Sequence, residues 1–375
     1  MRRTEHNPER LLVTGGAGFI GANFVHYWLT KYPDARIVVL DALTYAGNPA
    51  NLHRFSADPR LRFEKGDVVD EALVEALMRE ERIETIVHFA AESHVDRSIH
   101  GPDEFLRTNI IGTHSLLKAA RRVWLQDPQT STPNHRFHHV STDEVYGSLG
   151  PSDPAFHEDL PYAPNSPYSA SKASSDHLVR AYHHTYGLDV VTSNCSNNYG
   201  PFQFPEKLIP LVLVNILHGR QLPVYGDGMN VRDWLFVEDH CAGIDLCIRK
   251  GQAGETYNLG GKNEQTNIDI VRLLCRLLDA EFAADPSLAA RFPDSPAAGG
   301  RSSDELITFV ADRPGHDRRY AIDTTRAERE LGYRPAETFA SGILRTVRWY
   351  LDHEEWWRAV MDGRYREWLT VNYQS

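Results

Sequence analysis

Residues 11–21 read LLVTGGAGFIG, and this stretch decides the fold class of the chain. Leu11 to Thr14 form an apolar run that predicts a buried strand, and apolar spacing predicts a helix from Ile20 to Leu29. The GxxGxxG loop between them lets the backbone approach a pyrophosphate at the helix N-terminus. The stretch therefore predicts a dinucleotide-binding unit, although a glycine turn with only a structural role is the alternative.

Strands and helices alternate through the first 200 residues, and one further helix is predicted beyond them. Further strands are predicted at 37–40, 61–63, 85–89, 137–141 and 190–192, and further helices at 71–80, 105–123, 167–186 and 208–217. Such alternation is typical of an α/β protein with a doubly wound parallel sheet of the Rossmann type.

The composition is that of a globular protein, with 375 residues, 41% hydrophobic and 24% charged. The chain has 40 Lys and Arg and 51 Asp and Glu, which gives a net charge of −11. This acidic balance argues against a broad surface for binding nucleic acid or an anionic membrane. The polar start lacks a signal-peptide core, and no apolar run approaches the roughly 18–20 residues of a membrane span. We expect a cytoplasmic protein.

The 4 cysteines include no CxxC pair, which predicts neither a disulfide framework nor a zinc site. The 18 histidines include two adjacent pairs, at 138–139 and 183–184, without acidic or cysteine partners at ligand spacing. No metal is therefore expected.

Asp41 ends the second predicted strand, twenty residues past Gly21. An acid at this position accepts hydrogen bonds from a ribose 2′-hydroxyl and repels a 2′-phosphate, so it favours NAD over NADP. Asp67 and Val68 follow the third strand, where we expect the adenine.

Tyr168 and Lys172 are four residues apart in YSASK, so they share one face of the predicted helix. Ser166 is a candidate N-cap, with Pro167 at the first helical position. A neighbouring ammonium favours the phenolate, so Tyr168 is predicted to take a hydroxyl proton during hydride removal. YxxxK alone is common, but here it follows the fifth strand of a dinucleotide fold.

Residues 141–147 read STDEVYG at the end of that fifth strand, where ligands of such sheets bind. Thr142 can hydrogen-bond the oxygen that Tyr168 deprotonates. Asp143 and Glu144 can be a solvated turn, but beside hydride chemistry a paired acid and base are what a water elimination needs.

These motifs together resemble the extended short-chain dehydrogenase/reductase family, and within it the nucleotide-sugar 4,6-dehydratases that act on dTDP-glucose. The similarity covers nearly the whole chain. It is carried by GGAGFIG (15–21), FAAESHVDRS (89–98), STDEVYG (141–147), SPYSASKASSDHLVRAY (166–182), NCSNNYGP (194–201), FPEKLIP (204–210), RDWLFVEDH (232–240) and DRPGHDRRYAID (312–323).

The resemblance implies a tightly bound NAD that is regenerated in each turnover. The implied reaction oxidises C4 of dTDP-glucose, eliminates water across C5–C6 and returns the hydride to C6. The product would be dTDP-4-keto-6-deoxy-D-glucose, for deoxysugar biosynthesis. In this scheme Tyr168 is the base at the C4 hydroxyl, assisted by Thr142 and Lys172, Glu144 is the base at C5, and Asp143 is the acid at the C6 hydroxyl.

The resemblance also implies binding residues. The implied cofactor contacts are Gly15, Gly18, Phe19, Ile20, Gly21, Asp41, Ala42, Leu43, Thr44, Asp67, Val68, Phe89, Ala90, Ala91, Glu92, Ser93, Thr108, Tyr168, Lys172 and Asn197. The implied substrate contacts are Ser93, Thr142, Asn197, Lys207, Leu208, Pro223, Val224, Tyr225, Arg232, Asn267, Asp312, Arg313, Pro314, Gly315 and His316.

Arg232 is the strongest substrate candidate on chemical grounds, because a guanidinium forms bidentate hydrogen bonds to a diphosphate. A surface salt bridge to Asp233 or Glu238 is the alternative. Cys195 is expected to be buried, with nothing beside it that would favour a thiolate nucleophile.

Two domains are expected. An NAD-binding Rossmann domain would cover 1–200 with a returning segment at about 230–260, and a smaller α/β domain for the nucleotide sugar would cover 201–229 and 261–375. The resemblance implies a homodimer that packs through the helices near 105–123 and 167–186. Residues 281–304 lack periodicity and are expected to form a long loop or excursion, whereas the aromatic tail at 349–369 is expected to pack as helix and core.

Three other functions fit part of the pattern. A 4-epimerase shares the glycine loop and YxxxK but needs no acid–base pair at Asp143 and Glu144. A GDP-mannose dehydratase would place a serine where Asp143 stands. A non-catalytic NAD-sensing protein need not keep Tyr168, Lys172 and both carboxylates together.

Overall fold

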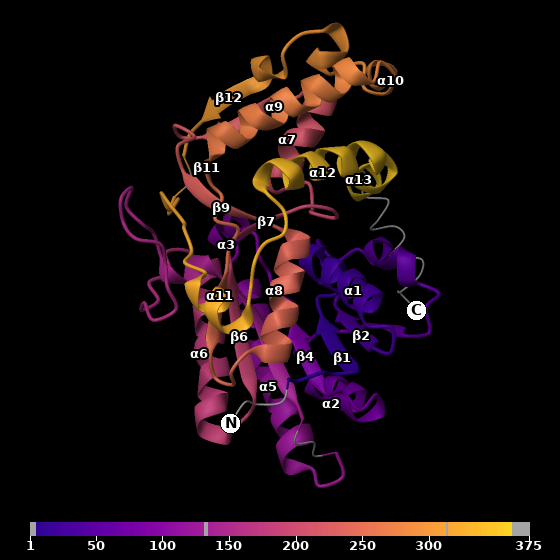
Figure 1. The fold of residues 1–375 in the computed structure, drawn as a ribbon, viewed down its shortest axis with the longest axis vertical. Helices are drawn as coiled ribbons and strands as arrows, with labels where there is room; N and C mark the ends of the chain where they lie inside the picture. Colours follow the sequence, from indigo (N-terminus) through magenta and orange to yellow (C-terminus); the bar gives the residue numbers. More distant parts are fainter. Residues whose placement is uncertain (1–4, 131–133, 313, 362–375) are drawn as a thin grey trace.

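The molecule has a larger and a smaller part, and the larger part is built around a seven-stranded parallel sheet (Figure 1). The computed structural model describes residues 5–130, 134–312 and 314–361. The strands are β1 (Arg10–Thr14), β2 (Arg36–Asp41), β3 (Leu61–Lys65), β4 (Thr85–His88), β5 (Arg136–Thr142), β6 (Val190–Cys195) and β10 (Thr256–Leu259). Their order is β10-β6-β5-β4-β1-β2-β3, so the chain winds outward from β1 in both directions and the predicted Rossmann-type fold is confirmed.

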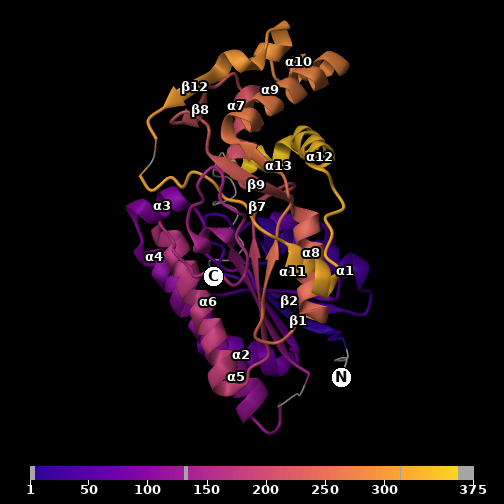
Figure 2. The same ribbon diagram turned by 60° about the vertical axis from the view of Figure 1, so that its left-hand side comes forward.

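Helices cover both faces of this sheet (Figure 2). One face carries α1 (Phe19–Lys31), α8 (Val237–Lys250) and α11 (Thr325–Leu331). The other carries α2 (Glu71–Glu80), α5 (Thr113–Arg121) and α6 (Pro167–Tyr186). The predicted helix at 105–123 is divided in the structure into α4 (Asp103–Phe105), a π-helical segment η2 (Leu106–Gly112), α5 and a second π-helical segment η3 (Arg122–Gln126).

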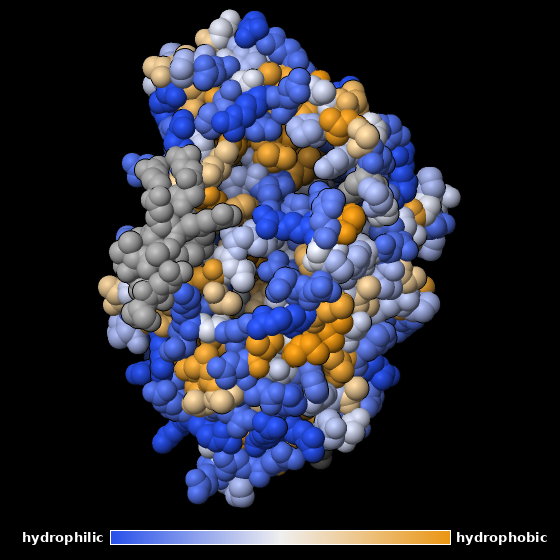
Figure 3. All heavy atoms as spheres, turned by 180° about the vertical axis from the view of Figure 1, so that it is seen from behind, coloured by the Kyte–Doolittle hydropathy of each residue, from blue (hydrophilic) through white to orange (hydrophobic). Residues whose placement is uncertain are grey.

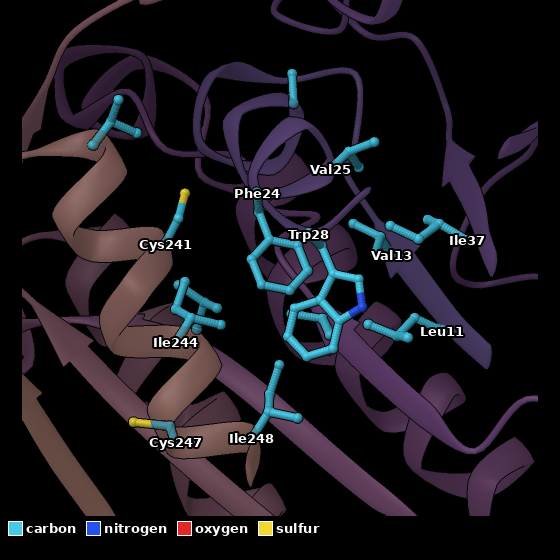
Figure 4. Close-up of a cluster of buried hydrophobic side chains, with 14 of the residues drawn as sticks. Leu11, Val13, Phe24, Val25, Trp28, Ile37, Cys241, Ile244, Cys247 and Ile248 are labelled. Atoms are coloured by element: carbon cyan, nitrogen blue, oxygen red, sulfur yellow. The ribbon is translucent and has the colours of Figure 1, made fainter. Parts of the chain in front are cut away.

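Alternate residues of β1 supply the cores on the two faces of the sheet. Leu11 and Val13 point to one core and Leu12 to the other, as the two-residue period of a strand requires. In the first core, Phe24 and Trp28 of α1 lie opposite Ile244 and Ile248 of α8 (Figure 4). This packing holds α1, and therefore the loop before it, against the sheet.

The smaller part of the molecule lies at the top of Figure 1 and has its own core. Its sheets are β11-β9-β7 and β12-β8. The strands are β7 (Asn197–Tyr199), β8 (Leu222–Tyr225), β9 (Val231–Phe236), β11 (Glu264–Thr266) and β12 (Ile307–Val310). The helices are α7 (Leu208–Leu217), α9 (Asn267–Ala284), α10 (Ser287–Arg291), α12 (Phe339–Asp352) and α13 (Glu354–Met361). The short helices α3 (Val95–His100), η1 (Pro49–Phe55) and η4 (Asp143–Tyr146) lie in loops of the larger part.

The expectation of a long loop at 281–304 is wrong. Helix α9 continues to Ala284, and α10, η5 (Pro296–Gly299) and η6 (Ser303–Leu306) follow it. Leu288 and Phe292 are four residues apart and both enter the core of the smaller part. Each helical segment is shorter than two turns, so none gives a period that the sequence pattern can reveal.

The aromatic tail packs as expected as far as the structure describes it. Tyr350 and Trp357 are fully buried in the core of the smaller part. The rest of the predicted stretch, from 362 to 369, lies outside the described residues.

Hydrophilic side chains cover most of the face seen in Figure 3, with apolar patches between them in its lower half. Among the described residues, no helix combines the length and the apolar character that a membrane span requires. The four cysteines are all buried and unpaired.

We expect Ile244→Ala to destabilise the larger part by about 2–5 kcal/mol, because Ile244 is fully buried between α8 and α1 and its truncation leaves a cavity. Urea denaturation followed by circular dichroism measures the loss. The exposed Lys250→Ala on the same helix is the control and should stay close to the unaltered chain. Equal stabilities for the two variants would contradict this account of the core.

Candidate active site

A cavity of about 340 Å³ opens at the carboxyl ends of the parallel strands. Its wall is built from the segments that directly follow β1, β2, β4, β5 and β6, together with α6 and the loop before α7. In open α/β sheets ligands bind at this edge, because all parallel strands deliver their following loops there.

The glycine loop fits closely around the end of β1. Gly15 has a φ of +70°, and a Cβ there would lie 2.6 Å from the backbone nitrogen of Ala90. A Cβ on Gly21 would lie 2.3 Å from the carbonyl oxygen of Gly15. Helix α1 begins at Phe19, so its first N–H groups face the cavity through residues 18–21. The loop and helix form a cradle for a pyrophosphate.

Asp41 ties the end of β2 to this cradle. Its Oδ2 accepts a hydrogen bond from the N–H of Ala17 at 2.9 Å, and its Oδ1 accepts one from Leu43 at 2.8 Å. Burial raises the pKa of the carboxyl group, and these two backbone bonds oppose that effect. Each carboxylate oxygen keeps a further lone pair that could accept a ribose hydroxyl.

The structure places nearly all of the expected cofactor residues on the cavity wall. These are Gly15, Gly18, Phe19, Ile20, Gly21, Asp41, Ala42, Thr44, Asp67, Val68, Phe89, Ala90, Ala91, Glu92, Ser93, Thr108, Tyr168, Lys172 and Asn197. Leu43 is the exception, since it is buried and lies outside the cavity wall.

Thr142, Asp143 and Glu144 all line the cavity where β5 ends. Thr142 caps the short helix η4 by accepting the N–H of Glu144 at 3.3 Å. Asp143 is only 1% exposed. Burial raises its pKa well above the usual range, and the charges of Glu144 and Asp233 add to this. The raised pKa favours the protonated form of Asp143, which is the form that a general acid needs.

Helix α6 begins as the sequence predicts. Ser166 and Ser169 form a capping box and Pro167 is the first helical residue, so Tyr168 and Lys172 both reach the cavity. The expected effect of Lys172 on the phenolate of Tyr168 stays a prediction. The Lys172 ammonium donates to the carbonyl oxygen of Val140 at 2.8 Å. Burial, followed by the charge of Glu144, raises the pKa of Tyr168 well above 10.

A buried polar layer behind the cavity was not foreseen from the sequence. Asp176, one turn after Lys172, accepts hydrogen bonds from Ser141 at 2.9 Å and from His139 at 3.0 Å. Both donors come from β5. Burial raises the pKa of Asp176 to about 6, and the charge of Lys172 opposes that effect. These hydrogen bonds hold α6 against β5, the strand that Asp143 and Glu144 follow.

A second unforeseen feature crosses the cavity. The loop at 203–207 reaches the segment after β4 through two contacts. Lys207 donates to the carbonyl oxygen of Ser93 at 3.0 Å, and Glu206 pairs with Arg97 at 3.2 Å. Phe204 on the same loop packs edge-on against Tyr45. The loop at 203–207 thus covers one side of the cavity.

The remaining expected substrate residues lie in the smaller part, beyond the cavity wall. Leu208 begins α7, Pro223, Val224 and Tyr225 lie on β8, and Asn267 begins α9. Asp312 accepts a hydrogen bond from His316 at 2.6 Å, with Pro314 and Gly315 between them, and Arg313 lies outside the described residues.

Arg232 is not a surface residue, so the alternative of a surface salt bridge is wrong. Its side chain is buried, donates to the carbonyl oxygen of Asp317 at 2.9 Å and stacks on the ring of Tyr320. Its positive charge acts to lower the pKa of Asp143, so it lies within electrostatic reach of the acid.

Cys195 lines the cavity beside β5, and burial raises the pKa of its thiol. The thiol donates to the carbonyl oxygen of Ser141 at 3.4 Å, so no feature favours a thiolate. Across the described ranges, no three His, Cys, Asp or Glu side chains come together as a metal site.

Comparison with known proteins places these features in a family. The family model for GDP-mannose 4,6 dehydratase matches residues 12–346. A dTDP-glucose 4,6-dehydratase of Neisseria meningitidis serogroup B is 54% identical, over 95% of this chain and 97% of its own length. One from Salmonella typhimurium is 50% identical, over 98% and 99%.

A solved structure agrees with these matches. The dTDP-glucose 4,6-dehydratase of Streptomyces venezuelae, crystallised with NAD bound, is 50% identical and has a TM-score of 0.81. The similarity covers 94% of this chain and 99% of that chain.

The Rossmann sheet, the glycine cradle and a tyrosine–lysine helix facing one cavity define a nucleotide-sugar enzyme of the extended short-chain dehydrogenase/reductase class. Within that class, the chain belongs to the dTDP-glucose 4,6-dehydratase family.

We expect Gly21→Ala to weaken NAD binding by ~10-fold or more, which corresponds to about 1.4 kcal/mol. The new Cβ would collide with the Gly15 carbonyl oxygen and push α1 away from the loop. Calorimetric titration of the cofactor-free chain measures the affinity. Gly101→Ala is the control, because a Cβ there has no neighbour closer than 4.0 Å. Unchanged affinity in Gly21→Ala would mean that the loop does not hold the pyrophosphate.

Proposed function

We propose that the chain converts dTDP-glucose into dTDP-4-keto-6-deoxy-D-glucose with a bound NAD, as an NAD-dependent hydro-lyase of deoxysugar biosynthesis. The observation that carries the proposal is the placement of Asp143. A buried acid with a raised pKa stands beside Glu144 and shares the cavity with Tyr168. Oxidation alone needs only Tyr168, whereas loss of water needs the acid and the base as well.

The residues present fit NAD. The glycine cradle and the first turn of α1 would hold the pyrophosphate, Asp41 would hold the adenosine ribose, and the segment 89–93 would line the nicotinamide side. When bound, NAD supplies the acceptor for a hydride from C4 and later the donor to C6, and its oxidised form brings a positive charge. Tyr168 needs such a charge, because the protein alone disfavours its phenolate.

The protein side of the reaction then follows from three groups. Tyr168 accepts the proton of the C4 hydroxyl as C4 is oxidised. The resulting ketone acidifies the hydrogen on C5, and Glu144 removes it. Asp143 donates its proton to the C6 hydroxyl, which leaves as water. Each group lines the same cavity, so the sugar need not move between steps.

The alternative functions lack a matching observation. A 4-epimerase makes no use of a buried Asp143 with a raised pKa. For a GDP-mannose substrate, a serine would be expected in that place. A non-catalytic NAD sensor does not require Tyr168, Glu144 and Asp143 to converge, and all three do.

We propose a division of tasks between the two parts of the chain. Residues 1–200, with 230–260, would hold NAD, while 201–229 and 261–375 would bind the nucleotide and diphosphate. In support, β8 and the start of α9 both lie in the smaller part of the molecule. The buried guanidinium of Arg232 is held in place by the ring of Tyr320 and by a hydrogen bond to the carbonyl oxygen of Asp317.

We also propose that the chain forms a homodimer in the cytoplasm. The helical face expected to pack across the interface exposes Leu106 at 46% and Ile111 at 52%, and Tyr186 on α6 is exposed as well. Exposed apolar groups on these helices support a protein–protein contact. The four unpaired cysteines suit a reducing compartment.

The first test is incubation of the purified chain with dTDP-glucose and no added cofactor. We expect mass spectrometry to show loss of one water, because NAD is regenerated and should travel with the protein. If the mass is unchanged, the reaction is repeated with added NAD. Formation of dTDP-galactose would favour the epimerase, and no conversion under either condition would refute the proposal.

Asp143→Asn and Glu144→Gln should each lower turnover by ~10²–10⁴-fold, since each removes one proton-transfer group. Binding of NAD and of the nucleotide sugar should change little, because neither substitution alters side-chain size. Steady-state rates and calorimetric affinities measure the two effects. The control is Asp153→Asn, an exposed carboxylate in the loop after β5. Near-normal turnover in either active-site variant would remove that residue from the mechanism.

A further inference from the structure

The proposed reaction leaves Tyr168 and Asp143 in protonation states that differ from those at the start. Tyr168 takes a proton from the C4 hydroxyl, and Asp143 gives one to the departing C6 hydroxyl. The proton that Glu144 removes from C5 returns to C5 when the hydride reaches C6. After one turnover, therefore, Tyr168 holds one proton too many and Asp143 one too few. One proton must move from Tyr168 to Asp143 before the next cycle.

Thr142 lies between these two groups. Its hydroxyl donates to Oδ1 of Asp143 across 3.4 Å, and the same hydroxyl lies close enough to Tyr168 to act on it as a hydrogen-bond donor that lowers the pKa of the phenol. One hydroxyl can accept a proton on a lone pair while it donates its own. Its position is fixed, because the same oxygen caps η4 through the N–H of Glu144.

Exchange with bulk water is restricted at both ends of this path. Asp143 and Tyr168 are both buried by the protein itself. Oδ2 of Asp143 is buried without a hydrogen-bond partner, so Oδ1 is the oxygen that is connected to a donor. A bound sugar would close the cavity further. A proton therefore passes between Tyr168 and Asp143 more readily through a neighbouring hydroxyl group than through bulk water.

Electrostatics also favour one shared proton. The charge of Glu144 raises the pKa of Tyr168 and that of Asp143, in each case after burial as the main cause. Two further anions beside Glu144 are therefore disfavoured. The two groups therefore keep at least one proton between them throughout the cycle.

We propose that Thr142 is a proton relay that resets the active site after each turnover. The O–H bond of Tyr168 breaks as its proton joins the oxygen of Thr142, and the original hydroxyl proton of Thr142 passes to Oδ1 of Asp143. The phenolate and the carboxylic acid are restored, with no other reactant. This inference rests on the proposed function, and it gives Thr142 a task beyond contact with the sugar oxygen.

The test compares single and multiple turnovers in rapid-quench mass spectrometry. Thr142→Val removes the hydroxyl at nearly the same volume, and Thr142→Ser keeps it. We expect the valine variant to lose at least ~10-fold more in multiple turnover than in single turnover, where each enzyme acts once. Small carboxylic-acid or imidazole buffers should restore part of its multiple-turnover rate, and the serine variant should stay within a few-fold of the unaltered chain.

Equal losses in single and multiple turnover would overturn the relay and limit Thr142 to the oxidation step. An unchanged multiple-turnover rate in the valine variant would overturn it as well. Circular dichroism establishes that the variants fold, and Thr142→Ala takes the place of Thr142→Val if that variant does not. Lack of dehydrated product from the unaltered chain would refute the proposed function itself, which separates the two failures.

Discussion

Parallel pairing of β5 with β4 and β6 is the constraint on which the site depends. The pairing sets Thr142 level with Cys195 and brings the loops after all three strands to one edge of the sheet. At the opposite end of β5, Arg136 pairs with Asp189 at 2.9 Å. The strand is thus held at both ends, so the residues that follow Thr142 begin from a fixed position.

Helix α6 is fixed against the same strand by buried polar contacts. Lys172 donates to the backbone of Val140, and Asp176 accepts from Ser141 and His139. Because Tyr168 is one turn before Lys172, these contacts also set where its hydroxyl lies relative to Thr142. The acid, the base and the tyrosine therefore share one rigid frame made of a strand and a helix.

Local signals predicted much of the fold and the site. The bounds of α6 and α7 agree with the sequence pattern, because capping residues and apolar spacing act within a few residues. Long-range contacts could not be predicted in this way. The hydrogen bond between His139 and Asp176 joins residues far apart in the chain. Whether Lys172 donates to the carbonyl oxygen of Val140 depends on the packing of α6 against β5. The helices after α9 are too short to show a hydrophobic period in the sequence. Their position depends on the burial of Leu288 and Phe292 in the core of the smaller part.

Asp176 has a thermodynamic consequence for the whole chain. Its pKa lies at about 6 in the folded protein, against 3.8 for a solvated carboxyl group. The folded state therefore binds this proton more tightly than the unfolded state, and its contribution to stability is full below pH 3.8 and is lost as the pH rises through 6. A partly exposed, paired carboxylate such as Asp58 has a lowered pKa and acts in the opposite sense. At neutral pH the strand and helix that carry the site are therefore joined through a buried carboxylate whose charge favours unfolding.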